Sequence, residues 1–497
     1  MKNWILFGLT AVIVFLLAML AYSVMDRKTE ARFAYQPKVQ IEGIEPRDSV
    51  WGLNYPRQYQ SYMKTQDTTF KSMYNTSGFM DVLDHQPELI VLWAGYAFSK
   101  GYNQPRGHAY AITDVLNSVR IGSPMEPGDG VMPSTCWTCK SPDVPRLMSE
   151  MGVTEYYSTK LSSLGSEVIN PIGCADCHNP QTMNLTITRP ALIEAFEAMG
   201  KDINQASHQE MRSLVCAQCH VEYYFDKTKP GKENANYLTF PWKDGLSVEA
   251  METYYDNIDF ADWTHPISKA KMIKAQHPDY ELFEMGIHAK RGVSCADCHM
   301  PYKNEGGQKF TDHHIGSPLS NVENSCFVCH REKQEDLMTD VYERQRKVKE
   351  GSSSIQKQLA MAHIEAGKAW ELGATEEQMK EILIGIRHAQ WRWDFVVASH
   401  GGAFHAPLES SRIITSAMGT IQESRIQLTR LLASLGHNKP VNMPDFSNKA
   451  ALQTYIGLDM EKDLKDKSKF LEQVVPQWLK EGKAREAKKE VKTVSSR

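Results

Sequence analysis

The chain has no strong excess of charge of either sign. Its 497 residues include 56 lysines and arginines against 60 aspartates and glutamates, which gives a formal net charge of −4. A nucleic-acid partner would be expected to require a marked basic excess, so this balance argues against one. The remaining composition, with 41% hydrophobic and 23% charged residues, is that of an ordinary globular protein long enough for more than one core.

Cysteine is absent outside five short motifs. All ten cysteines fall in five Cys-x-x-Cys pairs, so none is left for a disulfide or a free thiol. Four pairs are followed directly by histidine, and the first is followed by lysine. The motifs are Cys136, Cys139 and Lys140; Cys174, Cys177 and His178; Cys216, Cys219 and His220; Cys295, Cys298 and His299; Cys326, Cys329 and His330.

A cysteine pair followed by histidine is the attachment motif of c-type haem. Two thiols about one helical turn apart can add to the two vinyl groups of one haem, and the adjacent histidine then reaches the iron. Paired Cys-x-x-Cys knuckles can also bind zinc. Zinc would not require histidine after four of five pairs, and five pairs leave one knuckle without a partner. The pattern therefore predicts five covalently bound haem c groups.

An uncharged apolar run, WILFGLTAVIVFLLAMLAYSVM, lies between Lys2 and Asp26. Its length is close to that of a membrane-spanning helix and exceeds the usual apolar core of an export signal. We expect residues 1–25 to be a signal sequence or a membrane anchor, with a slight preference for an anchor. In both cases the rest of the chain would lie outside the cytoplasmic membrane.

The amino-acid composition of the sequence changes after the fifth motif. Residues 40–335 are interrupted by glycine, proline and asparagine and contain all five motifs. Residues 337–372 are charged and lack proline, while 375–399 and 408–435 repeat apolar residues at helical spacing. Three long helices are expected here, with most of their apolar faces in the core and part available for a subunit interface.

We therefore predict a mainly α fold, a multihaem cytochrome c with short helices and loops around five haems, followed by long C-terminal helices. The expected divisions are 26–335 for the haem-binding catalytic region, 336–436 for the long helices and 437–497 for an extension packed on the same domain. The basic tail from Lys480 onward is expected to be a solvated, frayed end.

Lys140 sets the first motif apart. A haem iron with histidine at both axial positions is full and can only pass electrons, and the 17 histidines are ample for four such haems. To bind iron, the lysine amine must lose a proton against an ordinary pKa of about 10.4, which a metal can drive. An amine also alters the electronic properties of the iron. We interpret this site as catalytic; the alternative is a degenerate site whose haem takes its ligand from elsewhere.

At this point the sequence closely resembles the pentahaem cytochrome c nitrite reductases, which form ammonium from nitrite. The resemblance covers most of the chain after the apolar run. It includes LWAGYAFSKGYNQPRGHAYAITDV, CWTCKSPDV, GCADCHNP, CAQCHVEYYFD, FPWKDG, KAQHP, GIHAK, CADCHMP, TDHHIG and RHAQWRWD. The combination of CWTCK with four CxxCH motifs is highly specific.

The resemblance implies roles for particular residues. Lys140 would be the proximal ligand of the active-site haem, and Arg120, Tyr223 and His277 would surround its open face. A calcium ion beside the site would be held by the Glu222 carboxylate, the Gln276 side-chain oxygen and the carbonyl oxygens of Tyr223 and Lys274. The second to fifth motifs would take His313, His108, His405 and His288 as distal ligands, with His313 preferred to His314 and His405 to His400.

The resemblance further implies a periplasmic homodimer that is associated with the cytoplasmic membrane. Electrons would come from a membrane-bound multihaem quinol dehydrogenase or from a soluble donor, and nitrite would be the substrate.

 Two other classes of multihaem protein are alternatives to a nitrite reductase. A multihaem electron carrier without its own substrate would need five six-coordinate irons. A hydroxylamine-oxidising multihaem enzyme would carry more haem motifs than the five found here.

Overall fold

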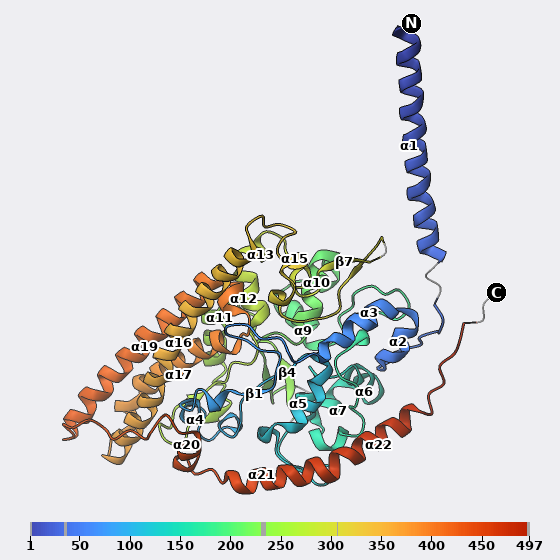
Figure 1. Ribbon diagram of the computed structural model, residues 1–497. Helices are drawn as coiled ribbons and strands as arrows, with labels where there is room; N and C mark the ends of the chain where they lie inside the picture. The colour runs from blue at the N-terminus through green and yellow to red at the C-terminus, as the bar shows by residue number, and fades with distance from the viewer. Residues whose placement is uncertain (1, 34–36, 230–234, 306, 495–497) are drawn as a thin grey trace.

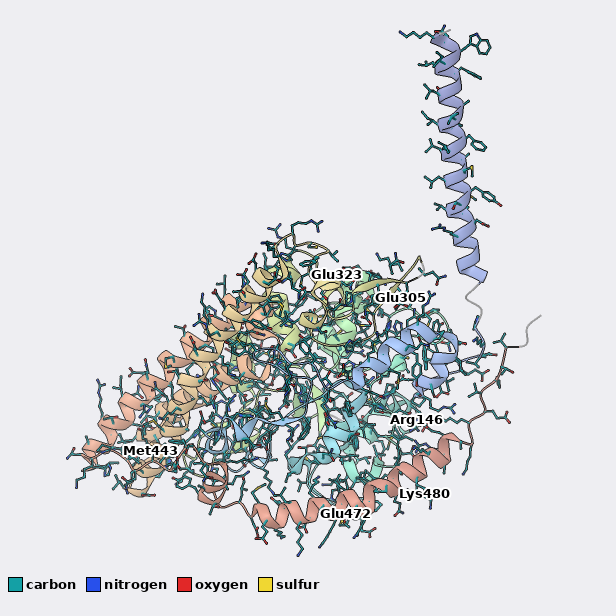
Figure 2. The ribbon with its side chains drawn as sticks, viewed as in Figure 1. Arg146, Glu305, Glu323, Met443, Glu472 and Lys480 are labelled. Atoms are coloured by element: carbon teal, nitrogen blue, oxygen red, sulfur yellow. The ribbon has the colours of Figure 1, made fainter. Side chains whose placement is uncertain are left out.

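The computed structural model describes residues 2–33, 37–229, 235–305 and 307–494, and it is mainly helical (Figure 1). Helix α1 (Lys2–Phe33) stands apart from a body that contains the other elements. Its segment Lys2–Arg27 is apolar and long enough to cross a membrane, with a mean hydropathy of 2.6. The side chains of this segment project around the helix without neighbours (Figure 2). The apolar run at the N-terminus is thus a separate helix and contributes nothing to the core of the body.

The region that carries the five motifs is built from short elements, as expected from its glycine and proline content. Within the described part of this region no α-helix is longer than ten residues. The helices are α2 (Asp48–Asn54), α3 (Pro56–Tyr62), α4 (Leu89–Leu92), α5 (Ala111–Asn117), α6 (Asp143–Met151), α7 (Val153–Ser158), α8 (Cys174–Cys177), α9 (Pro190–Ala198), α10 (His208–Ala217), α11 (Val248–Asn257), α12 (Asp279–Met285), α13 (Ile287–Lys290), α14 (Cys295–His299) and α15 (Val322–Ser325).

The strands of the described residues form four separate antiparallel pairs and no larger sheet. They are β1 (Met80–Asp81) with β2 (Asn103–Gln104), β3 (Tyr224–Asp226) with β4 (Tyr237–Thr239), β5 (Trp263–Thr264) with β6 (Lys271–Met272), and β7 (Tyr302–Glu305) with β8 (Gln308–Thr311). Pairs this short position loops rather than form a layer of their own.

Three long helices follow the last motif: α16 (Gln334–Glu371), α17 (Glu376–Ala398) and α19 (Pro407–Ser434), with the single turn α18 (Gly402–His405) between the last two. Helix α19 packs along both α16 and α17, and the three form the elongated arm of the body (Figure 1). The predicted mainly α fold with long C-terminal helices is confirmed. Arg425 interrupts the apolar face of α19 because it pairs with Glu365 on α16, with its Nε 2.9 Å from Oε2.

The C-terminal extension forms α20 (Lys449–Tyr455), α21 (Met460–Lys469) and α22 (Val475–Glu486), with a π-helical turn between the last two. It runs along the edge of the body opposite α1, and Glu472 and Lys480 lie on its outer side (Figure 2). The expectation of a frayed tail from Lys480 is wrong up to Glu486, where α22 ends, and Thr493 pairs with Val39 in an antiparallel bridge. The basic side chains themselves are mostly exposed, as expected.

One cluster of buried apolar residues runs through the motif region, the long helices and the extension, from Leu83 to Trp478. A second, smaller cluster joins Val39, Ile41 and Trp51 to Ala175 beside the second motif. The motif region and the long helices therefore share a core, and loops from the first are held against helices of the second.

Candidate active site

Four pairs of histidine rings face each other, and each pair joins a motif histidine to one of the predicted distal histidines. The ring centroids are 6.3 Å apart for His178 and His313, 6.4 Å for His220 and His108, 6.2 Å for His299 and His405, and 6.4 Å for His330 and His288. Two imidazoles on opposite sides of one metal ion would be separated by roughly 6 Å, since each metal–nitrogen bond is roughly 2 Å and each nitrogen lies roughly 1 Å from its ring centre. The four spacings fit one iron between each pair.

The same geometry bears on the two choices that the sequence left open. His313 faces His178, while His314, its neighbour in the chain, has no ring contact with that motif among the described residues. His405 faces His299, while His400 lies 5.9 Å from His277 between ring centroids. The assignment of these residues as iron ligands stays a prediction, and the geometry favours the choices made from the sequence.

The Nδ1 atoms of several of these rings are fixed by oxygen atoms of the protein. His178 Nδ1 lies 2.9 Å from the Met183 carbonyl oxygen, His299 Nδ1 2.8 Å from that of Gly316, and His313 Nδ1 2.8 Å from that of Thr311. A hydrogen bond at Nδ1 leaves Nε2 as the free nitrogen, which is how metal-binding histidines are commonly oriented. Burial lowers the pKa of His313 to about 4, and so favours the neutral ring that a metal requires.

The first motif lies in a different environment. Cys136 and Cys139 fall at the end of the 3₁₀ turn Ser134–Trp137 and just before α6. Burial raises the pKa of Cys136 to about 11, and the positive charges of Arg120 and Lys140 offset part of that rise. Arg120 and Lys140 are thus close enough to this cysteine to act on its charge, as expected if both belong to one site.

Tyr223 and His277 complete the group around the first motif. Their ring centroids are 6.4 Å apart. Burial holds the pKa of His277 well below its ordinary value, and the charge of Lys140 acts in the same direction. Arg120 lowers the otherwise raised pKa of Tyr223. The structure therefore brings together the four side chains that the resemblance placed in the active site, although they come from four separate segments.

The guanidinium of Arg120 has one hydrogen-bond donor, Nη1, that no described residue accepts. Arg120 sits in the 3₁₀ turn Val119–Ile121, and its guanidinium carbon lies 4.7 Å from the centre of the Phe98 ring. Its Nη1 is buried and has no hydrogen-bond partner among the described residues. A buried guanidinium with an unused N–H is suited to bind a small oxyanion, because leaving a charged donor unpaired is unfavourable.

The predicted calcium ligands also converge. Glu222 is fully buried; its Oε2 accepts a hydrogen bond of 2.6 Å from the Gln276 N–H, and its Oε1 one of 3.0 Å from the Tyr255 hydroxyl. The Gln276 side-chain nitrogen donates to the Lys274 carbonyl oxygen at 2.9 Å. Three of the four predicted ligands thus lie in direct contact.

The charge around Glu222 fits a cation. Burial raises its pKa well above the ordinary range, and the neighbouring carboxylate of Glu281 raises it further. The Lys274 ammonium does not balance these charges directly, because it pairs with Asp394 at 2.9 Å. The described residues contain no group of three or more histidines, cysteines, aspartates or glutamates that could hold a metal ion. Calcium at Glu222 would therefore rely on carbonyl and amide oxygens, which it accepts readily.

Several residues near the site were not found from the sequence. Phe98 lies under Arg120; Asp279, two residues after His277, lies 3.4 Å from His220 Nδ1; and Glu281 accepts a hydrogen bond of 2.8 Å from the Glu222 N–H. The stretch HPDYE, with acidic residues two and four positions after His277, was the available signal for the last two.

Comparison with known proteins identifies the family of the chain. A model of the Cytochrome c552 family matches residues 48–489. A cytochrome c-552 of Parabacteroides distasonis is 56% identical over 481 residues, which cover 97% of this chain and 96% of the relative. A cytochrome c-552 of Aliarcobacter butzleri is 46% identical over 485 residues, covering 97% and 95% of the two chains.

A solved structure is similar as well. The catalytic subunit of the cytochrome c nitrite reductase from Desulfovibrio desulfuricans, described with two calcium sites, matches with a TM-score of 0.72 and 32% identity over 88% of this chain and 95% of that one. The fold and the facing histidines define a multihaem c-type cytochrome. The chain belongs to the cytochrome c552 family, and the resemblance found in the sequence is confirmed.

Proposed function

We propose that the protein reduces nitrite to ammonium, a six-electron reaction, at the haem attached to Cys136 and Cys139. The observation that carries the proposal is the difference between the five motifs. Four motif histidines each face a second histidine at 6.2–6.4 Å, whereas Lys140 lies in a group with Arg120, Tyr223 and His277. Membership of the family and the similarity to a nitrite reductase support the same reaction.

Each side chain of the group has a role that its chemistry allows. When bound, the haem would supply an open iron position and the electrons for reduction. The Lys140 amine, once it has lost its proton, would be a ligand of this iron. Arg120 would bind the anion through its free Nη1. His277 would donate a hydrogen bond and deliver protons, and Tyr223 would donate a second hydrogen bond.

The other four haems would carry electrons. Each of these haem irons would be held by a motif histidine together with His313, His108, His405 or His288. Haems held by two histidines would serve for electron transfer and would supply the active site with electrons. Five covalently bound haem c groups are the expected complement, one for each cysteine pair.

Calcium would bind beside the site through the Glu222 carboxylate, the Gln276 side-chain oxygen and the carbonyl oxygens of Tyr223 and Lys274. The Gln276 amide would turn, because its nitrogen now faces the Lys274 carbonyl that the ion would share. The two buried carboxyl groups of Glu222 and Glu281 support a cation at this place. Its charge would favour entry of an anion and fix the backbone that carries Tyr223.

The setting of the enzyme follows from the same reasoning. We propose a periplasmic protein held near the cytoplasmic membrane by α1, which receives electrons from a membrane-bound multihaem quinol dehydrogenase or a soluble donor. The arm of α16, α17 and α19 would provide the surface for a homodimer, as in the family it resembles.

Product analysis with spectroscopy tests the proposal. The purified protein, reduced by dithionite through a viologen dye, should convert nitrite to ammonium stoichiometrically. Its electron paramagnetic resonance spectrum should contain one high-spin haem beside four low-spin haems. Five low-spin haems and no ammonium would instead identify an electron carrier without its own substrate.

A further inference from the structure

The C-terminal extension reaches the loop that carries Arg120 through one buried lysine. Helix α21 lies against the turn Val119–Ile121, and Lys467 of this helix is only 4% exposed. Its Nζ donates a hydrogen bond of 3.1 Å to the Leu116 carbonyl oxygen and a second one to the carbonyl oxygen of Gly122. These two carbonyl groups lie on either side of the turn that holds Arg120.

A buried ammonium group requires compensation. Lys467 has no ion-pair partner among the described residues, and burial lowers its pKa to about 8. Its partners are the two carbonyl oxygens and the face of the Phe470 ring, 4.8 Å from Nζ. Leu116 lies in the last turn of α5, where carbonyl groups lack helical partners and a positive charge is favourable. Lys467 thus links the C-terminal end of α5 to Gly122, the residue that follows the turn holding Arg120.

The extension also holds the other side of the Arg120 guanidinium. Phe98, beneath that group, belongs to the turn Ala97–Ser99. Gln453 Nε2 of α20 donates to the Ser99 carbonyl oxygen at 3.2 Å, and Asp463 of α21 pairs with Lys100 at 2.7 Å. The extension therefore contacts both segments between which the guanidinium lies.

We propose that Lys467 is a positioning residue for Arg120: its ammonium ties the carbonyl oxygens of Leu116 and Gly122 together and so fixes the guanidinium over Phe98, where it receives nitrite. Lys467 does not touch substrate or haem in this assignment. The inference rests on the proposed role of Arg120 as the nitrite-binding group.

The test is steady-state kinetics on the full holoprotein with Lys467→Met, which keeps the length and apolar stem of the side chain but removes its donors. The Michaelis constant for nitrite should rise about tenfold with a smaller change in kcat, because the misplaced guanidinium weakens binding of the anion. Haem content, measured as the pyridine haemochrome, should stay at the wild-type value. Lys467→Arg, which keeps a cation with several donors, should recover part of the affinity.

The matched control is Lys465→Met, which removes an exposed lysine from the same helix and should leave the Michaelis constant unchanged. An unchanged constant in Lys467→Met with full haem content would overturn the proposal. If Lys467→Met does not accumulate with its haems, Lys467→Gln decides: its shorter side chain cannot span both carbonyl oxygens, so a raised constant supports the proposal and a wild-type constant overturns it. Failure of the wild-type protein to form ammonium would refute the proposed function instead, and the two failures are thereby distinguished.

Discussion

The motif region and the long helices satisfy their buried polar groups in different ways. In the long helices, side chains pair with one another: Arg425 with Glu365 at 2.9 Å, and His363 Nε2 with the Gln390 amide oxygen at 2.9 Å. In the motif region, the buried His108 Nδ1, Arg120 Nη1 and Glu281 Oε2 have no partner among the described residues. Among the described residues of the long helices, Gln345 Oε1 and Gln356 Nε2 of α16 are also without a partner. The unpaired groups of the motif region differ in lying beside the predicted haem, substrate and calcium positions, which such ligands would fill.

This contrast has a physical basis. A long helix satisfies its own backbone and buries one face, so residues at helical spacing are sufficient to stabilise it. Short helices and turns gain little from local interactions, and a large apolar haem surface can replace the aliphatic core that they lack. We therefore expect substitutions in the motif region to change activity or haem content, and substitutions in the helices to change stability.

Removing one arginine from each region gives the largest expected contrast. Arg120→Ala should lower kcat/KM for nitrite by about 100- to 1000-fold, as loss of a single well-placed donor to an anion does in other enzymes, with little change in thermal stability. Arg425→Ala should leave the kinetics unchanged and lower the free energy of unfolding by about 1–2 kcal/mol, because Glu365 loses its partner at a partly exposed site. Ammonium formation and thermal unfolding measure the two effects. A similar loss of activity in both variants would contradict the separation.

Acid should weaken the long-helix region through a pair of stacked histidines. His265 and His363 are fully buried with ring centroids 3.8 Å apart, and burial lowers the pKa of His363 to about 4. The native ring stays neutral, whereas the unfolded chain takes up a proton below its ordinary pKa of about 6.5. Stability is thus full above that pH and falls as the pH drops toward 4, by about 3 kcal/mol for His363 alone.

Thermal unfolding followed by circular dichroism between pH 7.5 and 4.5 measures this loss. His363→Gln should show a smaller slope of stability against pH, whatever its absolute stability. His85→Gln removes an exposed histidine and should keep the wild-type slope. Equal slopes in wild type and His363→Gln would mean that other groups dominate the acid response.

Lys140→His should have a smaller effect than loss of Arg120. The variant should keep five haems, because both cysteines of the motif remain, and it should lower nitrite turnover about tenfold, since the axial ligand that tunes the iron has changed. Turnover and the pyridine haemochrome are measured on the same preparation. Unchanged turnover would show that the lysine is not adapted to this reaction.

The sequence alone predicted the features that depend on residues close together in the chain. The five motifs are contiguous, and the long helices follow from residues such as Ile386 and Ile421 at helical spacing, both fully buried. The predicted distal histidines came from the family resemblance, and their ring distances to the motif histidines fit one iron between each pair. Contacts between distant segments could not be predicted, because no local sequence pattern encodes them. The Phe98 ring under Arg120 and the hydrogen bonds of Lys467 to Leu116 and Gly122 join parts of the chain that are far apart. The paired end of the tail at Thr493 was missed for the same reason.

Removal of calcium should give the smallest effect and the finest test of the contrast. Chelation should lower nitrite turnover about fivefold while haem content stays constant, because the ion would orient Gln276 and Tyr223 but hold no haem. Glu222→Gln should lower turnover to a similar extent and make it insensitive to the chelator. Glu305→Gln, at an exposed position in β7, should behave as wild type.

The comparison of chelator and variant separates two roles for the ion. If the ion acts only on the active site, the two treatments together should lower turnover no further than either alone, because both remove the same interaction. Release of haem on chelation would instead make the ion part of the structure that holds the motif region together. The motif region would then depend on calcium as well as on haem for its fold. Its difference from the long helices would be larger than the contacts between Glu222, Gln276 and Lys274 alone indicate.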